Sequence, residues 1–285
     1  MNILITGANG QLGSELRKRT ALLPNANFLF TDVDELNITK EDAVDDFFKK
    51  NPIDFVVNCA AYTAVDKAED EQNMALAINS NAVSNLAEAC VKHNSFLIHI
   101  STDYVFNGKG YKPYSEKDFV DPISFYGRSK LQGEQVAKNA QKGLIIRTSW
   151  LYSNFGGNFV HTMQKVGSTK DSINVVFDQI GTPTFAGHLA DTIWKIIPQL
   201  NNWNEGVQVY HFSNEGVCSW YDFAVEIMKQ SKLNCQVCPI ESKDYPTPAE
   251  RPFYSVLNKA KIKQRFGLSI PHWKDGLLEM LGNQK

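Results

Sequence analysis

The sequence has few cysteines, little net charge and no long apolar run. Its 285 residues include five cysteines, and 31 acidic against 29 basic side chains leave a formal charge of −2. So balanced a chain offers no strongly basic surface for nucleic acid or an anionic membrane. No stretch approaches the roughly 20 apolar residues of a membrane-spanning helix, and residues 1–7 are too short an apolar start for a secretory signal. We therefore expect a cytoplasmic protein with neither nucleic acid nor membrane as a partner.

The scarcity of cysteine also argues against a metal centre. Cys235 and Cys238 form one close pair, but neither a second such pair nor paired histidines accompany it, as a structural zinc site requires. The alternation of Cys, Val and Pro in this segment is more typical of a strand. Cys59, Cys90 and Cys218 stand alone in apolar or aromatic surroundings that suit small buried side chains. We expect no bound metal.

The first half of the chain alternates short apolar runs with amphipathic helical stretches. The apolar runs predict strands at residues 2–6, 27–31, 55–58, 96–101 and 144–148. Strands that are apolar throughout are typical of a parallel sheet covered by helices on both faces. The repeated strand–helix–strand order predicts an α/β fold with a doubly wound parallel sheet of the Rossmann type.

Beyond about residue 150 the pattern becomes irregular and rich in glycine and proline. Because the chain is longer than an average domain, we expect two lobes that enclose a cleft. Residues 1–150 are predicted to form an NAD(P)-binding domain, and residues 151–285 mainly a smaller α/β substrate-binding domain. Segments near 173–197 and 207–212, which contain strand-like runs, are expected to return to the first domain.

A glycine-rich turn follows the first predicted strand. Gly7, Gly10 and Gly13 are spaced by three between that strand and a helical stretch, as in dinucleotide-binding turns. The first glycine permits a tight turn, the second lets backbone approach a pyrophosphate, and the third allows close helix packing. The helix N-terminus presents free N–H groups to the phosphates. The predicted cofactor is therefore NADPH or NADH.

The choice between the two cofactors stays open at this point. Asp32 ends the second predicted strand about 20 residues beyond the glycines, where a carboxylate accepts hydrogen bonds from the adenosine ribose and favours NAD. Arg17, Lys18 and Arg19 lie close enough in sequence for one of them to meet the 2′-phosphate of NADP. Small side chains in segment 58–63, at the end of the third strand, would let the cofactor lie against the backbone.

Side chains suited to carbonyl reduction follow the fourth strand and occupy the next helix. Thr102 and Asp103 lie at the carboxyl end of the predicted sheet, where ligands of such folds bind. Tyr126 and Lys130 are four residues apart and share one helical face. Ketone reduction needs a proton at oxygen while hydride reaches carbon, and a nearby ammonium lowers the pKa of a phenol. Lys130 can also bind the nicotinamide ribose, and Thr102 can donate to the substrate oxygen.

Taken together, these motifs resemble the extended short-chain dehydrogenase/reductase superfamily. More narrowly, blocks spread over nearly the whole chain are similar to the dTDP-4-dehydrorhamnose reductase family. The blocks are residues 64–69 (AVDKAE), 101–106 (STDYVF), 147–150 (RTSW), 178–184 (DQIGTPT) and 246–252 (PTPAERP).

This resemblance implies reduction of the 4-keto group of dTDP-4-dehydro-L-rhamnose to dTDP-L-rhamnose, the last step of dTDP-rhamnose biosynthesis. It implies Tyr126 as proton donor, Lys130 as its partner and Thr102 as carbonyl ligand. Arg251 would suit the diphosphate, since a guanidinium matches phosphate oxygens. The expected substrate-binding residues are Val65, Thr102, Asp103, Trp150 and Arg251. The expected cofactor-binding residues are Gly7, Gly10, Gln11, Leu12, Gly13, Asp32, Asn37, Ile38, Ala60, Ala61, Tyr62, Thr63, Tyr126 and Lys130.

The sequence departs from the family pattern at two positions. Asn37 stands where the family commonly has an aspartate that binds the adenine amine. Some members dimerise through magnesium held by carboxylates, whereas His188 ends a segment that lacks the first of them. The chain is accordingly expected to be a monomer or a homodimer without metal.

Two alternatives remain beside a dTDP-4-dehydrorhamnose reductase. Another sugar-nucleotide reductase or an epimerase of the superfamily would share most of these motifs, whereas a dehydratase would carry a glutamate where this chain has Tyr104. A non-catalytic NAD(P)-binding regulatory subunit, such as the β subunit of methionine adenosyltransferase, resembles the same family. The intact Thr102, Tyr126 and Lys130 argue against that last function.

Overall fold

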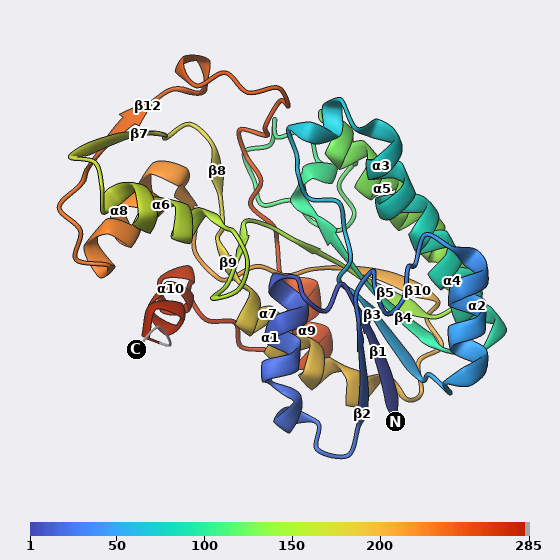
Figure 1. Cartoon of the computed structure of the whole chain (residues 1–285). Coiled ribbons are helices and arrows are strands. Elements are labelled where there is room, and N and C mark those ends of the chain that lie inside the picture. Colours follow the sequence, from blue (N-terminus) through green and yellow to red (C-terminus); the bar gives the residue numbers. More distant parts are fainter. Residues whose placement is uncertain (283–285) are drawn as a thin grey trace.

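The computed structural model describes residues 1–282 and is organised around a six-stranded parallel sheet of order β10-β5-β4-β3-β1-β2 (Figure 1). Chain order reverses direction at β1, which lies between β2 and β3, and ligands of such sheets bind at the carboxyl ends beside this point. The doubly wound parallel sheet predicted from the sequence is confirmed. Its strands are β1 (Asn2–Thr6), β2 (Asn27–Thr31), β3 (Phe55–Asn58), β4 (Phe96–Thr102), β5 (Gly143–Thr148) and β10 (Val207–His211).

Alternate side chains of these strands enter two separate cores, one on each face of the sheet. Ile3 and Ile5 point into one core, whereas Leu4 between them points into the other, as the two-residue period of a strand requires. Both faces are thus apolar, which explains the continuous hydrophobic runs. The helices of the first 150 residues are α1 (Gln11–Lys18), η1 (Thr20–Leu22), α2 (Glu41–Lys50), η2 (Lys67–Glu69), α3 (Gln72–Leu76), η3 (Ala77–Asn81), α4 (Ala82–Lys92), η4 (Asp103–Val105), α5 (Phe125–Ala137) and η5 (Lys138–Ala140).

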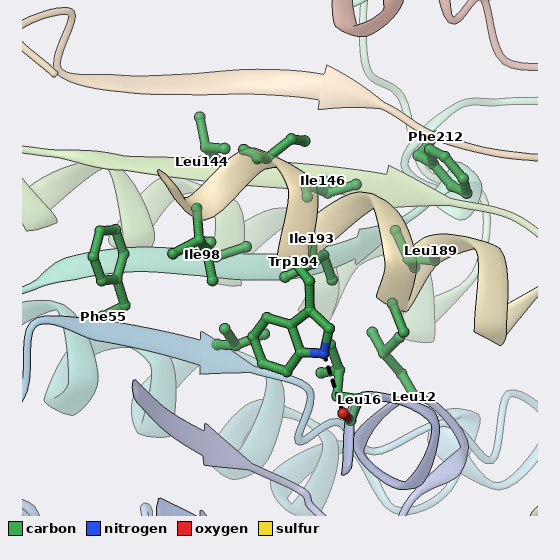
Figure 2. Close-up of a cluster of buried hydrophobic side chains, with 14 of the residues drawn as sticks. Leu12, Leu16, Phe55, Ile98, Leu144, Ile146, Leu189, Ile193, Trp194 and Phe212 are labelled. Carbon is green, nitrogen blue, oxygen red and sulfur yellow. Dashed lines mark hydrogen bonds between the residues drawn. The ribbon is translucent and has the colours of Figure 1, made fainter. Parts of the chain in front are cut away.

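Helices α1, α7 (Ala186–Ile196) and α9 (Ala260–Phe266) cover the first of these faces (Figure 1). Trp194 of α7 lies in its centre with its indole N–H donating to the Leu16 carbonyl of α1 at 3.1 Å (Figure 2). This bond satisfies the polar atom of a fully buried tryptophan. The opposite face is covered by α2, α4 and α5. Helix α5, which carries Tyr126 and Lys130, is therefore held directly on the sheet.

The second lobe has a core of its own, lined by the remaining helices and short strand pairs. Its apolar centre includes Phe223 and Trp273, which meet edge to face at 5.7 Å. The remaining elements are β6 (Leu151–Tyr152), α6 (Phe159–Gly167), β7 (Ser172–Val176), β8 (Ile180–Gly181), β9 (Thr184–Phe185), η6 (Ile197–Leu200), β11 (Cys218–Ser219), α8 (Trp220–Gln230), β12 (Gln236–Ile240), η7 (Ser242–Asp244) and α10 (Trp273–Gly282).

The segments expected to return to the first domain behave differently. β10 pairs with β5 in the main sheet, and α7 packs in the core over α1. β7 instead pairs with β12 in a separate two-stranded sheet. The expected return of segment 173–197 to the main sheet is therefore wrong for its strand, because β7 finds its hydrogen-bond partner within the second lobe. The exact domain boundary stays a prediction.

Two further observations concern the cysteines and the helices. Cys235 directly precedes strand β12, and Cys238 lies within it. Both thiols are free. Among residues 1–282 no helix combines the length and the apolar character needed to cross a membrane.

We predict that Gly133→Ala destabilises the protein by about 1–3 kcal/mol, the usual cost of overpacking. A Cβ at Gly133 on α5 would lie 2.0 Å from the backbone oxygen of Asn79 in η3, which has no room to yield. Denaturant unfolding measures the change. Gly157→Ala is the matched control, since a Cβ there meets nothing within 4 Å. Equal stability of both variants would contradict the close approach of α5 to η3.

Candidate active site

Helix α5 brings Tyr126 and Lys130 to the carboxyl end of β4. The helix starts after Ser124, whose hydroxyl accepts a hydrogen bond from the Gly127 N–H at 3.2 Å and caps the first turn. Tyr126 and Lys130 are both buried one turn apart. The Lys130 ammonium donates to the Ile100 carbonyl of β4 at 2.7 Å. The buried end of this lysine is thereby anchored to the strand that carries Thr102.

Burial governs the protonation of both side chains. It raises the pKa of Tyr126 to about 12, against an opposing hydrogen bond with Thr102. It lowers the pKa of Lys130 to about 8, with a smaller opposing effect of the Glu134 carboxylate. Lys130 is not among the groups that shift the pKa of Tyr126 here, and its expected lowering of that pKa stays a prediction. At neutral pH the phenol therefore holds its proton and the ammonium is mostly charged.

Thr102 and Asp103 are polar neighbours of the Tyr126 phenol. The Thr102 hydroxyl donates to a carboxylate oxygen of Asp103 at 2.9 Å and accepts from the Tyr104 N–H at 3.2 Å. Burial raises the pKa of Asp103 to about 6, while hydrogen bonds from Ser255 and Thr102 lower it. The ring of Tyr104 meets that of Tyr126 edge to face at 5.4 Å. The structure thus brings Thr102, Asp103 and Tyr126 into one buried cluster.

The glycine turn has the geometry of a dinucleotide cradle. Gly7 adopts φ +63°, and a Cβ there would lie 2.6 Å from the backbone nitrogen of Ala60. A Cβ on Gly13 would lie 2.5 Å from the Gly7 carbonyl oxygen. Only glycine satisfies either position without displacing backbone. The turn therefore holds β1, α1 and the segment after β3 in mutual contact.

The N-terminus of α1 is left open for an anion. Gly10 is the N-cap residue, and no side chain among the described residues caps the helix. Its first N–H groups therefore have no side-chain acceptor, and with the helix dipole they form a site suited to phosphate. Leu12 turns its side chain into the core, so only its backbone can face a ligand. These residues fit the pyrophosphate of a dinucleotide.

Asn79 secures the segment after β3 to helix α5. Its amide oxygen accepts from the Tyr62 N–H at 2.9 Å, and its amide nitrogen donates to the Tyr62 carbonyl and to the Ser129 hydroxyl at 3.1 and 3.0 Å. Ser129 lies between Tyr126 and Lys130 on α5. Asn79 was missed from the sequence, since an asparagine within a helix carries no local signal of its partners.

Other expected cofactor contacts are arranged around the same edge. Asp32 accepts from the Asn9 N–H at 3.0 Å, which holds the acidic side chain against the glycine turn. Arg17 stacks its guanidinium over Phe30 at 4.7 Å, whereas Arg19 pairs with Asp191 at 3.0 Å and is already engaged. The other expected positions lie in two loops. In the first, the side-chain oxygen of Asn37 accepts a hydrogen bond from the Thr39 N–H, and Ile38 is buried. The second loop follows β3 and contains Ala60, Ala61 and Thr63.

Two expected substrate residues, Val65 and Trp150, pack in different apolar clusters. Val65 packs in the apolar cluster that contains Tyr126. Trp150 adopts φ +48° and stacks on Trp220 at 3.6 Å with the rings nearly parallel. A Cβ on Gly181 would lie 2.6 Å from the Trp150 ring, so that glycine makes room for the indole. Trp220 was not predicted from the sequence.

Arg251 lies at the wall of a cavity of about 260 Å³ next to this tryptophan pair. Its guanidinium forms two hydrogen bonds with the Asp66 carboxylate, at 2.8 and 2.9 Å. Asp66 belongs to the same segment as Val65, so the pair connects the segment after β3 with the second lobe. The cavity is lined by Phe159, Met163, Gln179, Trp220, Thr247 and Arg251. Within residues 1–282 no group of three or more metal-ligating side chains is assembled, and the expected absence of metal stays a prediction.

The sheet, the glycine turn and the buried tyrosine and lysine together define an NAD(P)-dependent oxidoreductase of the short-chain dehydrogenase/reductase class. The family model described as RmlD substrate binding domain matches residues 1–285. A dTDP-4-dehydrorhamnose reductase of Aggregatibacter actinomycetemcomitans is 41% identical, with 96% of each chain aligned. The chain belongs to the dTDP-4-dehydrorhamnose reductase family.

Solved structures of relatives agree over the whole chain. A dTDP-4-dehydrorhamnose reductase of Clostridium acetobutylicum is 42% identical with a TM-score of 0.95, covering 100% of this chain and 99% of that one. The enzyme of Bacillus anthracis, solved in complex with NADP, is 37% identical with a TM-score of 0.93, and 99% of each chain is covered. The second lobe is thus shared by these relatives together with the sheet.

We predict that Asp32→Asn shifts the cofactor preference toward NADPH. The substitution keeps an acceptor for the Asn9 N–H but removes the charge that would bind a ribose diol and repel a 2′-phosphate. The ratio of kcat/KM for NADH to that for NADPH should fall about tenfold, the size expected for a charged hydrogen bond. Asp34→Asn, on an exposed neighbour, serves as control. An unchanged ratio in Asp32→Asn would remove Asp32 from the cofactor site.

Proposed function

We propose that this chain reduces the 4-keto group of dTDP-4-dehydro-L-rhamnose to give dTDP-L-rhamnose, with Tyr126 as the proton donor. The observation that carries the proposal is the buried cluster of Tyr126, Thr102 and Lys130 at the carboxyl edge of the sheet, beside the glycine turn. Membership of the reductase family supports the substrate. We propose NADPH or NADH as cofactor, because the Bacillus anthracis relative was solved with NADP and Asp32 suits a ribose.

Tyr126 delivers its phenolic proton to the carbonyl oxygen. The raised pKa of about 12 keeps the phenol protonated at neutral pH, so the donor is loaded before substrate binds. Reduction at carbon makes that oxygen an alkoxide, which is a stronger base than a phenolate, and proton transfer from Tyr126 is then favourable. The reduced nicotinamide, when bound, supplies the hydride. The O–H bond of the phenol breaks, a new O–H bond forms on the sugar, and a phenolate remains.

Lys130 and Thr102 stabilise the charges that this transfer creates. The Lys130 ammonium, held by the Ile100 carbonyl, lies one helical turn from the phenolate and can also bind the nicotinamide ribose. The single hydroxyl proton of Thr102, which is now donated to Asp103, would turn to the carbonyl oxygen as negative charge develops there. Both groups act more strongly at the transition state than on the neutral ketone.

The nucleotide part of the substrate fits the cavity in the second lobe. Trp220 at the cavity wall offers a flat apolar face for a ring, and Arg251 offers N–H groups to diphosphate oxygens. Trp150, stacked on Trp220, is assigned to the sugar pocket. The Asp66 carboxylate holds that guanidinium in a fixed orientation. Val65 and Asp103 would complete the sugar pocket beside Tyr126.

The cofactor would bind along the edge formed by the glycine turn and the segment after β3. The residues assigned to it are Gly7, Gly10, Gln11, Leu12, Gly13, Asp32, Asn37, Ile38, Ala60, Ala61, Tyr62, Thr63, Tyr126 and Lys130. We further propose that the protein acts in the cytoplasm as a monomer or homodimer, without nucleic acid as a partner.

The purified protein tests the reaction directly. Incubation with dTDP-4-dehydro-L-rhamnose should consume one NADPH or NADH per dTDP-L-rhamnose formed, followed by absorbance and by chromatography of the sugar nucleotide. The corresponding UDP-linked keto sugar is the control for the base. Sugar interconversion without net cofactor oxidation would identify an epimerase instead, and cofactor binding without turnover would identify a regulatory subunit.

We predict that Tyr126→Phe lowers kcat by a factor of about a hundred or more, as expected on loss of a positioned general acid. The ring stays, so the apolar cluster and the affinity for NADPH should be retained. Stopped-flow turnover and cofactor titration measure the two quantities. Tyr111→Phe, on a side chain that is 83% exposed, removes a hydroxyl of the same kind far into solvent and should leave kcat unchanged. Normal turnover in Tyr126→Phe would refute the assignment.

A further inference from the structure

A buried ion pair lies directly behind the catalytic lysine. Glu134, one turn beyond Lys130 on α5, accepts hydrogen bonds from two nitrogens of Arg147 on β5, at 2.8 and 2.7 Å. The side chains of Glu134 and Arg147 are only 1% and 5% exposed. A further hydrogen bond of 2.6 Å comes from the Ser101 hydroxyl on β4. One carboxylate therefore joins α5 to both strands that flank the site.

Arg147 is fully engaged in this arrangement. Its third nitrogen lies 3.4 Å from Nε2 of His211 on β10, and its guanidinium covers the Phe106 ring at 5.2 Å. Nδ1 of His211 faces the Tyr114 carbonyl at 3.0 Å, so Nδ1 donates and Nε2 is left to accept from Arg147. Burial and the Arg147 charge lower the pKa of His211 to about 3. The histidine is thus a neutral acceptor, and Glu134 is the partner that balances the arginine charge.

Glu134 also acts on Lys130 itself. The ammonium of Lys130 is anchored to the carbonyl of Ile100, the residue that precedes Ser101, and Ser101 binds Glu134. Among the groups that raise the pKa of this buried lysine, the Glu134 carboxylate has the largest effect. A buried lysine without such a partner loses its proton readily. The carboxylate is therefore positioned both to hold α5 against β4 and to keep the lysine charged.

We propose that Glu134, fixed by Arg147 and Ser101, is a positioning residue that keeps Lys130 charged and in register with Thr102 during reduction. This inference rests on the proposed function of Lys130. In this proposal Glu134 touches neither substrate nor cofactor. It acts through Lys130, and Arg147 acts through Glu134.

Of the ionisable groups around Lys130, Glu134 is the carboxylate that affects the pKa of the lysine. Cys59 and His99 face the lysine from the ends of β3 and from β4. Burial raises the pKa of the Cys59 thiol and lowers that of His99, so both are neutral. Ionisable residues on the remaining elements packed against α5 are not among the groups that shift the pKa of Lys130. They are Lys67, Glu69, Glu88, Cys90, Lys92, Asp103, Tyr104 and Lys138.

The test measures how kcat/KM falls at alkaline pH, which is the alkaline limb of the pH profile. The charged lysine exists below its pKa and is lost above it, so kcat/KM of the parent should fall as pH rises through about 8. In Glu134→Gln the limb should move to lower pH by about one unit, the effect of removing a nearby opposite charge. NADPH binding, followed by tryptophan fluorescence, should weaken at correspondingly lower pH. Glu88→Gln on α4 makes the same change on an exposed side chain and should leave both profiles in place.

A folded Glu134→Gln variant whose two profiles match the parent would overturn the proposal, as would an equal shift in Glu88→Gln. Should Glu134→Gln fail to fold, Glu134→Gln/Arg147→Met replaces it, since removing both partners leaves no unpaired buried charge. Its limb should also move down, and an unmoved limb would overturn the proposal. Absence of turnover in the parent would refute the proposed reaction alone, because the binding profile still reports the charge on Lys130.

Discussion

The proposed reaction depends on keeping one ammonium charged inside a buried site. Lys130 is nearly fully buried, and burial lowers the pKa of its ammonium. The Ile100 carbonyl and the Glu134 carboxylate offset that cost, and the glutamate is in turn neutralised by Arg147. The same low polarity keeps the Tyr126 phenol protonated. A protonated phenol and a fixed cation therefore arise from one buried environment, which disfavours a phenolate and accommodates an ammonium only where partners surround it.

The sheet supplies the rigid frame for this chemistry. The carboxyl ends of β1, β3 and β4 meet beside the point where strand order reverses, so the glycine turn, the Tyr62 segment and Thr102 emerge at one edge. Gly7 and Gly13 remove the side chains that would force these segments apart. Asn79 then links the Tyr62 segment to α5. The glycine turn, the Tyr62 segment and the helix that carries Tyr126 are thereby held together by the same few contacts.

Contacts between the two lobes extend this frame to the substrate. Asp66 near the cofactor side binds Arg251 of the second lobe, and Gln11 of the glycine turn accepts from Asn158 at 3.2 Å. Asn158 caps α6, which contributes to the cavity wall. Each lobe therefore holds residues that orient the other, and a nucleotide in the cavity would lie against residues tied to the cofactor turn.

The sequence alone determined the strands of the first half, the glycine turn and the Tyr126–Lys130 spacing, because each depends on a local period or on neighbours a few residues apart. Only the tertiary structure decided which distant side chains complete the site. Asp66 and Arg251 are 185 positions apart, and the protonation of Tyr126 at neutral pH follows from burial. Strand β7 likewise took its partner from β12. Pairing and desolvation between remote segments depend on the packed chain, and no local pattern encodes them.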